Sequence, residues 1–514
     1  MDTILVVDFG SQVAHLISRR VRELGVYSEI IPYDTSIISL NKKIKKLSVR
    51  GIILSGGPDS VRGGPKVPKQ MFFLGVPVLG ICYGHQLIAH MLGGKVVPSK
   101  QREYGFSVLR HKPGSTLLKG LKPEERIWMS HGDTVSELPP GFKGIASTPK
   151  IKIAAFEGPN GIYGVQFHPE VRHTVSGMKI LRNFLTICKA KRDWAMGDFI
   201  KTQVAGLRRQ IGSGRVILGL SGGVDSSVAA VLLDKAVHEN LHCVFVDNGL
   251  VRLGEPEYVA STFKKHLGFT HFHSIDASKE FLSKLAGVTD PEKKRKIIGE
   301  TFIRVFERKA RELEKKHGTF DFLAQGTIYP DRIESAKASR ASTRIKSHHN
   351  VVLPKKMRLK VVEPLKDLYK DEVRVVGKKL GLQKGILWRW PFPGPGLGVR
   401  CLGEVTKEKL EILKKADKIV DYELKKAGLE GRIWQAFPVI LPVKSVGVMG
   451  DSRTYSFIVA IRSVESVDAM TANFSKLDWA LLEHIASRIV NEVKGVNRVL
   501  YDITNKPPAT VEFE

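Results

Sequence analysis

The chain has 514 residues and a formal net charge of +29; 42% of its residues are hydrophobic and 26% are charged. At roughly 150 residues per domain, this length predicts about three domains. No apolar run is long enough to span a bilayer and the first residues lack the features of a signal peptide, so we expect a cytoplasmic protein with no membrane partner. The positive charges are spread in short clusters along the chain, so nucleic-acid binding is not expected as the main function.

The four cysteines, at positions 82, 188, 243 and 401, are scattered, and none forms a C-x-x-C pair. This spacing argues against a disulfide framework and against a cysteine-rich zinc site. Each cysteine is therefore a core residue, an unreactive thiol or a nucleophile.

Short apolar strands that run into glycine-containing turns and then into helices recur along the first two thirds of the chain. We expect strands at 4–7, 76–81, 216–220 and 244–246, with helices at 86–92, 178–190, 198–212 and from about 228. Buried strands that alternate with helices predict parallel sheets, and hence α/β domains.

Two segments divide this pattern. One boundary is expected near Trp194, and a second at the proline- and glycine-rich segment 391–396, which can neither continue a helix nor lie in a central strand. Beyond it, a strand at 456–462 and a helix at 479–493 indicate a smaller α+β domain. The predicted organisation is two parallel-sheet α/β domains, 1–193 and 194–393, followed by a C-terminal domain, 394–514.

A cysteine lies in the first of these strand–turn–helix units, in Gly80-Ile81-Cys82-Tyr83-Gly84. This is the spacing of a nucleophile elbow, with cysteine in the place of serine. Glycines permit the sharp turn, and the positive end of the following helix favours a thiolate. The motif alone is equally consistent with a core cysteine between two turn glycines.

A second motif, Gly164-Val165-Gln166-Phe167-His168-Pro169-Glu170, follows downstream. In an extended segment, residues two apart share a face, so His168 can act as a base toward a thiol while Glu170 orients its imidazole. Together the two motifs resemble those of the class I glutamine amidotransferases. The resemblance implies that Cys82 attacks the side-chain amide of glutamine, and that backbone N–H groups at Gly57 and Tyr83 form the oxyanion hole. His85 stands where close relatives have methionine.

A glycine- and serine-rich loop joins the strand at 216–220 to the next helix. It has no lysine after its glycines, so it is not a Walker A loop; a glycine-rich backbone at a helix N-terminus is nevertheless an anion site. The loop resembles the pyrophosphate loop of AMP-forming ligases, which implies ATP cleavage with Mg²⁺. An amidotransferase joined to such a ligase implies an ATP-driven amination, and no prosthetic group is expected. The residues of the loop are Ser221, Gly222, Gly223, Val224, Asp225, Ser226 and Ser227.

The C-terminal segment 506–514 resembles the tail of GMP synthetases, and this resemblance extends over nearly the whole chain. It implies XMP as the acceptor, with glutamine and ATP as the other substrates, and a homodimer paired through the last domain. The positions that match the family's XMP-binding residues are Arg295, Gln435, Lys506 and Glu512, and those that match its adenylation lid are Asp331, Glu334 and Lys346. Two further departures from the family pattern occur in and after the lid, at 351–354, where glycines are missing, and at Trp390, which replaces histidine. In the tail, Phe513 replaces tryptophan.

Two other functions fit parts of the sequence. Another AMP-forming enzyme, such as an NAD synthetase or a tRNA-thiolating enzyme, would share the loop at 221–227, but would not account for Cys82, His168 and Glu170 together with the tail. A nucleic-acid-binding or regulatory protein would use the positive charge, but complete motifs at both sites argue against decayed catalysis.

Overall fold

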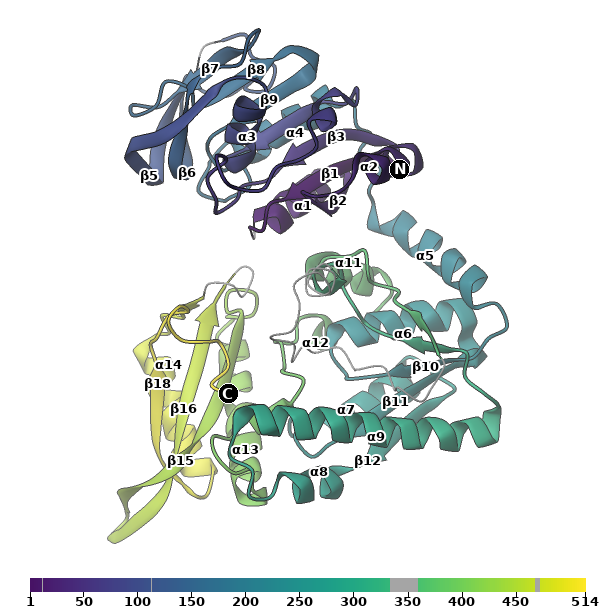
Figure 1. The fold of residues 1–514 in the computed structure, drawn as a ribbon. Coiled ribbons are helices and arrows are strands. Elements are labelled where there is room, and N and C mark those ends of the chain that lie inside the picture. Colours follow the sequence, from purple (N-terminus) through teal and green to yellow (C-terminus); the bar gives the residue numbers. More distant parts are fainter. Residues whose placement is uncertain (12, 112, 333–358, 467–471) are drawn as a thin grey trace. The chain divides into compact units, whose positions relative to one another are not determined.

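The computed structural model describes residues 1–11, 13–111, 113–332, 359–466 and 472–514 (Figure 1). The described residues form two compact units, Met1–Phe199 and Ile200–Glu514. Both contain parallel sheets with helices between successive strands, as predicted for α/β domains. The predicted three-domain division with its boundaries at 193/194 and 393/394 stays a prediction. No helix among the described residues has the length and apolar character needed to cross a bilayer.

The first unit is built on a nine-stranded sheet of order β2-β1-β3-β4-β9-β8-β7-β5-β6. The first five strands in this order, β2-β1-β3-β4-β9, pair in parallel. The other four, β8, β7, β5 and β6, extend the sheet with antiparallel pairings. The strands are β1 (Thr3–Asp8), β2 (Tyr27–Pro32), β3 (Val49–Leu54), β4 (Val78–Ile81), β5 (Lys95–His111), β6 (Glu124–Glu137), β7 (Lys143–Ser147), β8 (Ala155–Gly158) and β9 (Ile162–Val165). The helices are α1 (Val13–Glu23), α2 (Ile37–Leu47), α3 (Tyr83–Met91) and α4 (Gly177–Ile187).

Helix α5 (Met196–Ile211) leads into the second unit, which begins with a five-stranded, fully parallel sheet of order β12-β11-β10-β13-β14. Its strands are β10 (Val216–Gly219), β11 (Leu241–Asp247), β12 (Phe272–Asp276), β13 (Phe322–Ala324) and β14 (Lys360–Val362). Its helices are α6 (Val224–Val237), α7 (Glu255–Ala260), α8 (Ser278–Leu285), α9 (Pro291–His317), α11 (Lys370–Lys379) and α12 (Lys384–Leu387).

The C-terminal part of this unit is α+β, as the sequence predicted. Strands β15 (Gln435–Met449) and β16 (Ser452–Glu465) form a long antiparallel hairpin, which projects from the rest of the unit in Figure 1. The remaining elements are α13 (Lys407–Lys426), β17 (Asn473–Phe474), α14 (Trp479–Glu492) and β18 (Val496–Asp502). One hydrophobic core cluster joins the parallel sheet to the C-terminal part, from Ile217 and Phe306 to Leu413 and Ile485.

Two candidate active sites

The first candidate site is centred on Cys82, between the end of β4 and the start of α3. Cys82 has a φ of 54° and a ψ of −103°, a conformation that residues with a side chain rarely adopt. The flanking glycines are required for close packing: a Cβ at Gly80 would lie 2.4 Å from the carbonyl oxygen of Gly84, and a Cβ at Gly84 would lie 2.5 Å from that of Leu54. The sharp turn that the sequence predicted is therefore present.

The thiol of Cys82 is buried among polar groups. Its Sγ lies 3.4 Å from the carbonyl oxygen of Ser130 and 3.8 Å from Nε2 of Gln166. Its side chain also forms a hydrogen bond with that of His168. A Cβ at Gly56 would lie 3.2 Å from Cε1 of His168, so the backbone at 56 passes close to the pair and a side chain there would press on the imidazole.

His168 is held by Glu170, with 2.7 Å between Nδ1 and Oε1, and both side chains are buried. The contact forms in a turn that follows β9, so the extended alternation assumed from the sequence is not what brings these residues together. Burial lowers the pKa of His168, but the negative charges of Glu170 and Cys82 outweigh this effect and hold that pKa well above its ordinary value. The imidazole therefore favours its protonated form beside the sulfur.

The two predicted oxyanion-hole residues lie next to each other. A Cβ at Gly57 would lie 3.1 Å from Cγ of Tyr83. Tyr83 is the first residue of α3, where backbone N–H groups have no acceptor within the helix. Its hydroxyl donates to the carbonyl oxygen of Pro65 at 2.6 Å, and burial raises the pKa of Tyr83 to about 12. The ring is thus anchored at Pro65, and the backbone N–H belongs to the residue directly after Cys82.

Several polar residues near the thiol were missed from the sequence. Nε2 of His131 lies 3.3 Å from Oε2 of Glu103, and both side chains are almost fully buried. The carbonyl oxygen of Asp133 lies 2.9 Å from Nδ1 of His131 and accepts from Nε2 of Gln86 at 2.8 Å. The available signal was the run 130–133, Ser-His-Gly-Asp, which interrupts the apolar alternation of β6.

His85, the departure from the family pattern, lies in α3 and is fully buried. Neither ring nitrogen has a hydrogen-bond partner among the described residues. Burial, together with the charge of His131, lowers the pKa of His85 to about 3, so the ring is neutral. It packs against Phe156 with 4.6 Å between ring centroids and serves as an aromatic core residue.

The second candidate site is the loop 221–227, at the carboxyl end of β10. Helix α6 begins at Val224, about four residues earlier than the sequence suggested, because Gly223 caps the helix and residues 225–227 form its first turn. Gly222 has a φ of 74°, and a Cβ there would lie 2.7 Å from Val259, so glycine is required. The helix therefore directs its N-terminal N–H groups to the edge of the sheet where parallel α/β domains bind ligands.

The serine hydroxyls of this loop are fixed by one another and by the backbone. The Oγ atoms of Ser221 and Ser226 lie 2.9 Å apart. The hydroxyls of Ser226 and Ser227 donate to the carbonyl oxygen of Gly223 at 3.1 and 2.7 Å. The loop is thus ordered before any ligand arrives.

Asp225 is the charged residue of the loop. Its Oδ2 accepts from Nζ of Lys370 at 2.6 Å, whereas its buried Oδ1 has no partner among the described residues. An unpaired carboxylate oxygen at this position fits a hard cation such as Mg²⁺. Lys370 was not anticipated from the sequence, and neither was Arg389, whose Nη1 lies 3.5 Å from the carbonyl oxygen of Gly222.

Two of the four predicted XMP residues meet directly. Nε2 of Gln435 donates to Oε1 of Glu512 at 2.7 Å. Arg295 instead donates to the backbone oxygen of Glu514, and the backbone of Lys506 forms an isolated bridge with Ala472.

Three fully buried cations, none of them anticipated, hold the tail in place. Arg400 forms a two-armed contact with Glu512, at 3.1 and 3.0 Å. Arg462 donates to the carbonyl oxygen of Thr510 at 3.0 Å, and Lys294 pairs with Glu514. These contacts hold residues 510–514 against the rest of the second unit.

The predicted lid is described only at its start. Oδ2 of Asp331 accepts from the backbone N–H of Ile328 at 3.1 Å. Glu334, Lys346 and the departure at 351–354 lie outside the described residues. The second departure, Trp390, is a buried member of the core.

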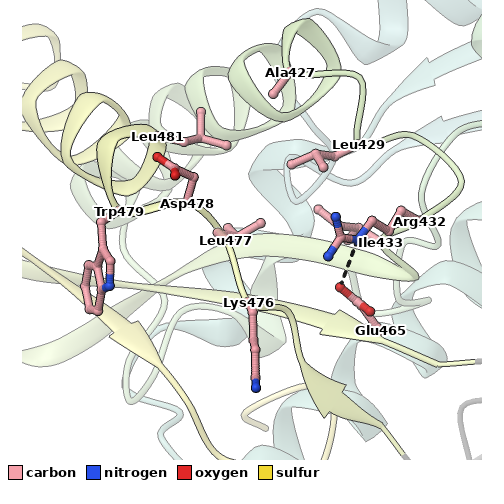
Figure 2. Close-up of a pocket in the computed structure, with 10 residues that line it drawn as sticks. All are labelled: Ala427, Leu429, Arg432, Ile433, Glu465, Lys476, Leu477, Asp478, Trp479 and Leu481. Atoms are coloured by element: carbon pink, nitrogen blue, oxygen red, sulfur yellow. Dashed lines mark ion pairs between the residues drawn. The ribbon is translucent and has the colours of Figure 1, made fainter.

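A hollow of about 560 Å³ lies beside α14, between the end of α13 and β16 (Figure 2). Its lining combines leucines with Arg432 and Glu465, which form an ion pair, and with the highly exposed Trp479. None of the predicted site residues lines it, so we assign the chemistry to the two sites above.

Comparison with protein families matches three segments of the chain. Residues 5–188 match glutamine amidotransferase class-I, residues 195–285 match NAD synthase, and residues 422–513 match the GMP synthase C terminal domain. The first two matches contain the two candidate sites.

Curated relatives match along the full length. The glutamine-hydrolyzing GMP synthase of Syntrophomonas wolfei is 56% identical over 518 residues, covering 100% of this chain and 99% of the relative. Those of Symbiobacterium thermophilum and Aquifex aeolicus are 55% and 54% identical, covering 100% and 99% of this chain and 99% of each relative.

Proposed function

This chain belongs to the glutamine-hydrolysing GMP synthases, and we propose that its synthesis of GMP is divided between the two sites described above. The enzyme converts XMP, ATP, glutamine and water into GMP, AMP, pyrophosphate and glutamate. The observation that supports the division most directly is that a cysteine–histidine–glutamate constellation and an ordered anion loop occur in separate α/β units.

In the first site, Sγ of Cys82 attacks the carboxamide carbon of glutamine. His168 holds the proton from the thiol and donates it to the amide nitrogen of the substrate. Ammonia leaves, and a thioester between Cys82 and the glutamyl group remains. Glu170 stabilises the imidazolium, and the backbone N–H groups of Gly57 and Tyr83 stabilise the oxyanion. Water then releases glutamate, with His168 as its base.

In the second site, the loop 221–227 holds the pyrophosphate that leaves as an XMP oxygen attacks the α-phosphorus of ATP. The N–H groups at the start of α6 and the fixed serine hydroxyls supply donors to it. Mg²⁺, held by Oδ1 of Asp225, would neutralise phosphate charge when bound. Ammonia then attacks the carbon of the adenylated XMP and displaces AMP, which yields GMP.

For XMP, Glu512 is the central group of the proposed pocket. Arg400 and Gln435 occupy three of its hydrogen bonds, and a carboxylate offers about four acceptor positions, so one remains for a purine N–H. Arg295 and Lys506 would supply positive charge to the phosphate, and Asp331, Glu334 and Lys346 would act in adenylation.

The assignment is tested by measuring AMP and GMP from ATP, XMP, Mg²⁺ and glutamine, with ammonium as the alternative nitrogen source. Equal amounts of AMP and GMP are expected. AMP that forms only with another acceptor would contradict XMP as the substrate, and the absence of ATP cleavage with any acceptor would contradict the ligase.

Substitution of the nucleophile separates the two sites. Cys82→Ala should abolish glutamine-dependent synthesis while synthesis from ammonium stays near its original rate, because the second site needs only free ammonia. Cys188→Ala, at another buried cysteine of the first unit, is the matched control. Loss of both activities in Cys82→Ala would mean that the cysteine is structural.

A homodimer paired through the C-terminal domain is the proposed assembly. The β15–β16 hairpin carries highly exposed apolar side chains, among them Val446, Val448 and Tyr455. Single-chain proteins rarely expose such surface together, and a second copy would cover it. Sedimentation at working concentration should give twice the chain mass; a monomer would contradict the proposal.

The proposed location is the cytoplasm. Support comes from the four free cysteines, which are typical of reducing compartments, and from the use of nucleotides as substrates.

A further inference from the structure

A cluster of histidines lies in the second unit, far from the residues proposed for catalysis. His242 is at the start of β11, His271 and His273 flank the start of β12, and His317 ends α9. The backbone N–H of Cys243 donates to the carbonyl oxygen of His271 at 2.9 Å, so the two strands hold these residues side by side. The rings of His242 and His271 are parallel, with 4.3 Å between centroids.

The nitrogen atoms of this cluster converge. His242, His271 and His273 each offer one ring nitrogen, and these three atoms lie within 4.8 Å of one another. Nδ1 of His242 lies 3.3 Å from Nε2 of His273. In a tetrahedral zinc site with Zn–N bonds of about 2.0–2.1 Å, ligand nitrogens are about 3.3–3.4 Å apart. One pair already has this spacing. The ring of His271 is stacked on that of His242, so His271 must turn before its in-plane lone pair can point to the same position.

The surroundings suit metal ligation. The side chain of His242 is buried and those of His271 and His273 are partly buried, so the converging nitrogens are partly shielded from water. Oε2 of Glu239 lies 3.6 Å from Nε2 of His271, slightly beyond hydrogen-bond distance, and a small shift would let this carboxylate orient a ligating imidazole. The ring of His317 lies across that of His242 at 4.8 Å, on one side of the cluster.

We propose that His242, His271 and His273 bind a zinc-class divalent cation that fastens β11 to β12. The site is structural rather than catalytic. His242 pairs with Ile217 of β10, and the phosphate loop begins four residues later at Ser221, about 13 Å away at roughly 3.3 Å per residue. A cation here would stabilise the sheet without contacting ATP.

The test is zinc binding by the full-length, tag-free protein after removal of metal with a chelator. Titration calorimetry with ZnCl₂ should show one site per chain that survives Cys82→Ala, and zinc should raise the melting temperature. His271→Ala and His273→Ala should each weaken that binding at least about tenfold. His238→Ala, at a nearby exposed histidine outside the cluster, is the control and should bind as the original protein does.

X-ray absorption on the zinc-loaded original protein provides a second measurement that does not depend on variants folding. At least three imidazole nitrogens and no sulfur ligand are expected. Absence of a bound zinc, a sulfur ligand, or equal affinity in the cluster variants and the original protein would each overturn the proposal.

Discussion

Replacing Glu170 with glutamine would test how the first site activates its nucleophile. The substitution keeps the shape of the side chain and an acceptor for Nδ1 of His168, but removes the negative charge 2.7 Å away. A hydrogen bond to a charged group contributes about 1.5–3 kcal/mol, compared with about 0.5–1.5 kcal/mol for a neutral one. Removal of the charge therefore costs roughly 1–2 kcal/mol of imidazolium stabilisation.

At about 1.36 kcal/mol for each tenfold change in rate, glutamine hydrolysis should fall roughly 5- to 30-fold. The pH profile should change as well. Glu170 is the largest influence that raises the pKa of His168, so this pKa is lower in the variant. The imidazolium is then lost at lower pH, and the alkaline limb of the glutaminase pH profile shifts to lower pH.

The assay is glutamate release in the presence of XMP and ATP, measured across pH, beside GMP synthesis from ammonium. Glu157→Gln, at a less buried carboxylate of the same unit that pairs with Lys143, is the matched control. An unchanged glutaminase rate and pH profile would refute the role of Glu170. An equal fall in ammonium-dependent synthesis would show damage beyond the first site.

Three further substitutions test other parts of the structure. Asp225→Ala should reduce GMP synthesis from glutamine and from ammonium alike by roughly 100-fold, because both routes need ATP activation; Asp234→Ala, on the same helix, is the control, and full activity of Asp225→Ala would reject the phosphate loop. Arg400→Met leaves Glu512 without its buried partner. The free energy of unfolding should fall by about 3–5 kcal/mol and the KM for XMP should rise. An unchanged KM would argue against Glu512 as an XMP ligand. His85→Met removes two buried ring nitrogens that have no partner among the described residues. Urea titrations should show a free energy of unfolding that is higher by about 1–3 kcal/mol, with glutaminase activity retained. Destabilisation would mean that the ring nitrogens have partners.

The features that the sequence predicted well are local ones. Gly80, Cys82 and Gly84 lie within five consecutive residues, and steric limits on that short segment are enough to require a sharp turn. The same holds for the loop at 221–227, where glycine precedes the first turn of a helix. The predicted contact between His168 and Glu170 is present. The prediction assumed strand alternation, but residues 166–170 form a turn and not a strand.

What the sequence could not supply are partners that folding brings together from distant positions. Asp225 and Lys370 are separated by 145 residues, and Arg400 and Glu512 by 112. No local pattern marks Arg400 as the fully buried cation that holds the tail, because burial of a charge depends on which carboxylates the fold places around it.

The backbone at Cys82 has a consequence for how this enzyme could change over generations. A non-glycine residue at positive φ costs about 1–3 kcal/mol. Cys82 therefore lowers the free energy of unfolding relative to a glycine at this position. In a population with abundant ammonium, selection for heat resistance would favour loss of the thiol, and glutamine use would disappear while the ligase persisted. We therefore expect a lineage to keep the strained cysteine where free ammonia is scarce.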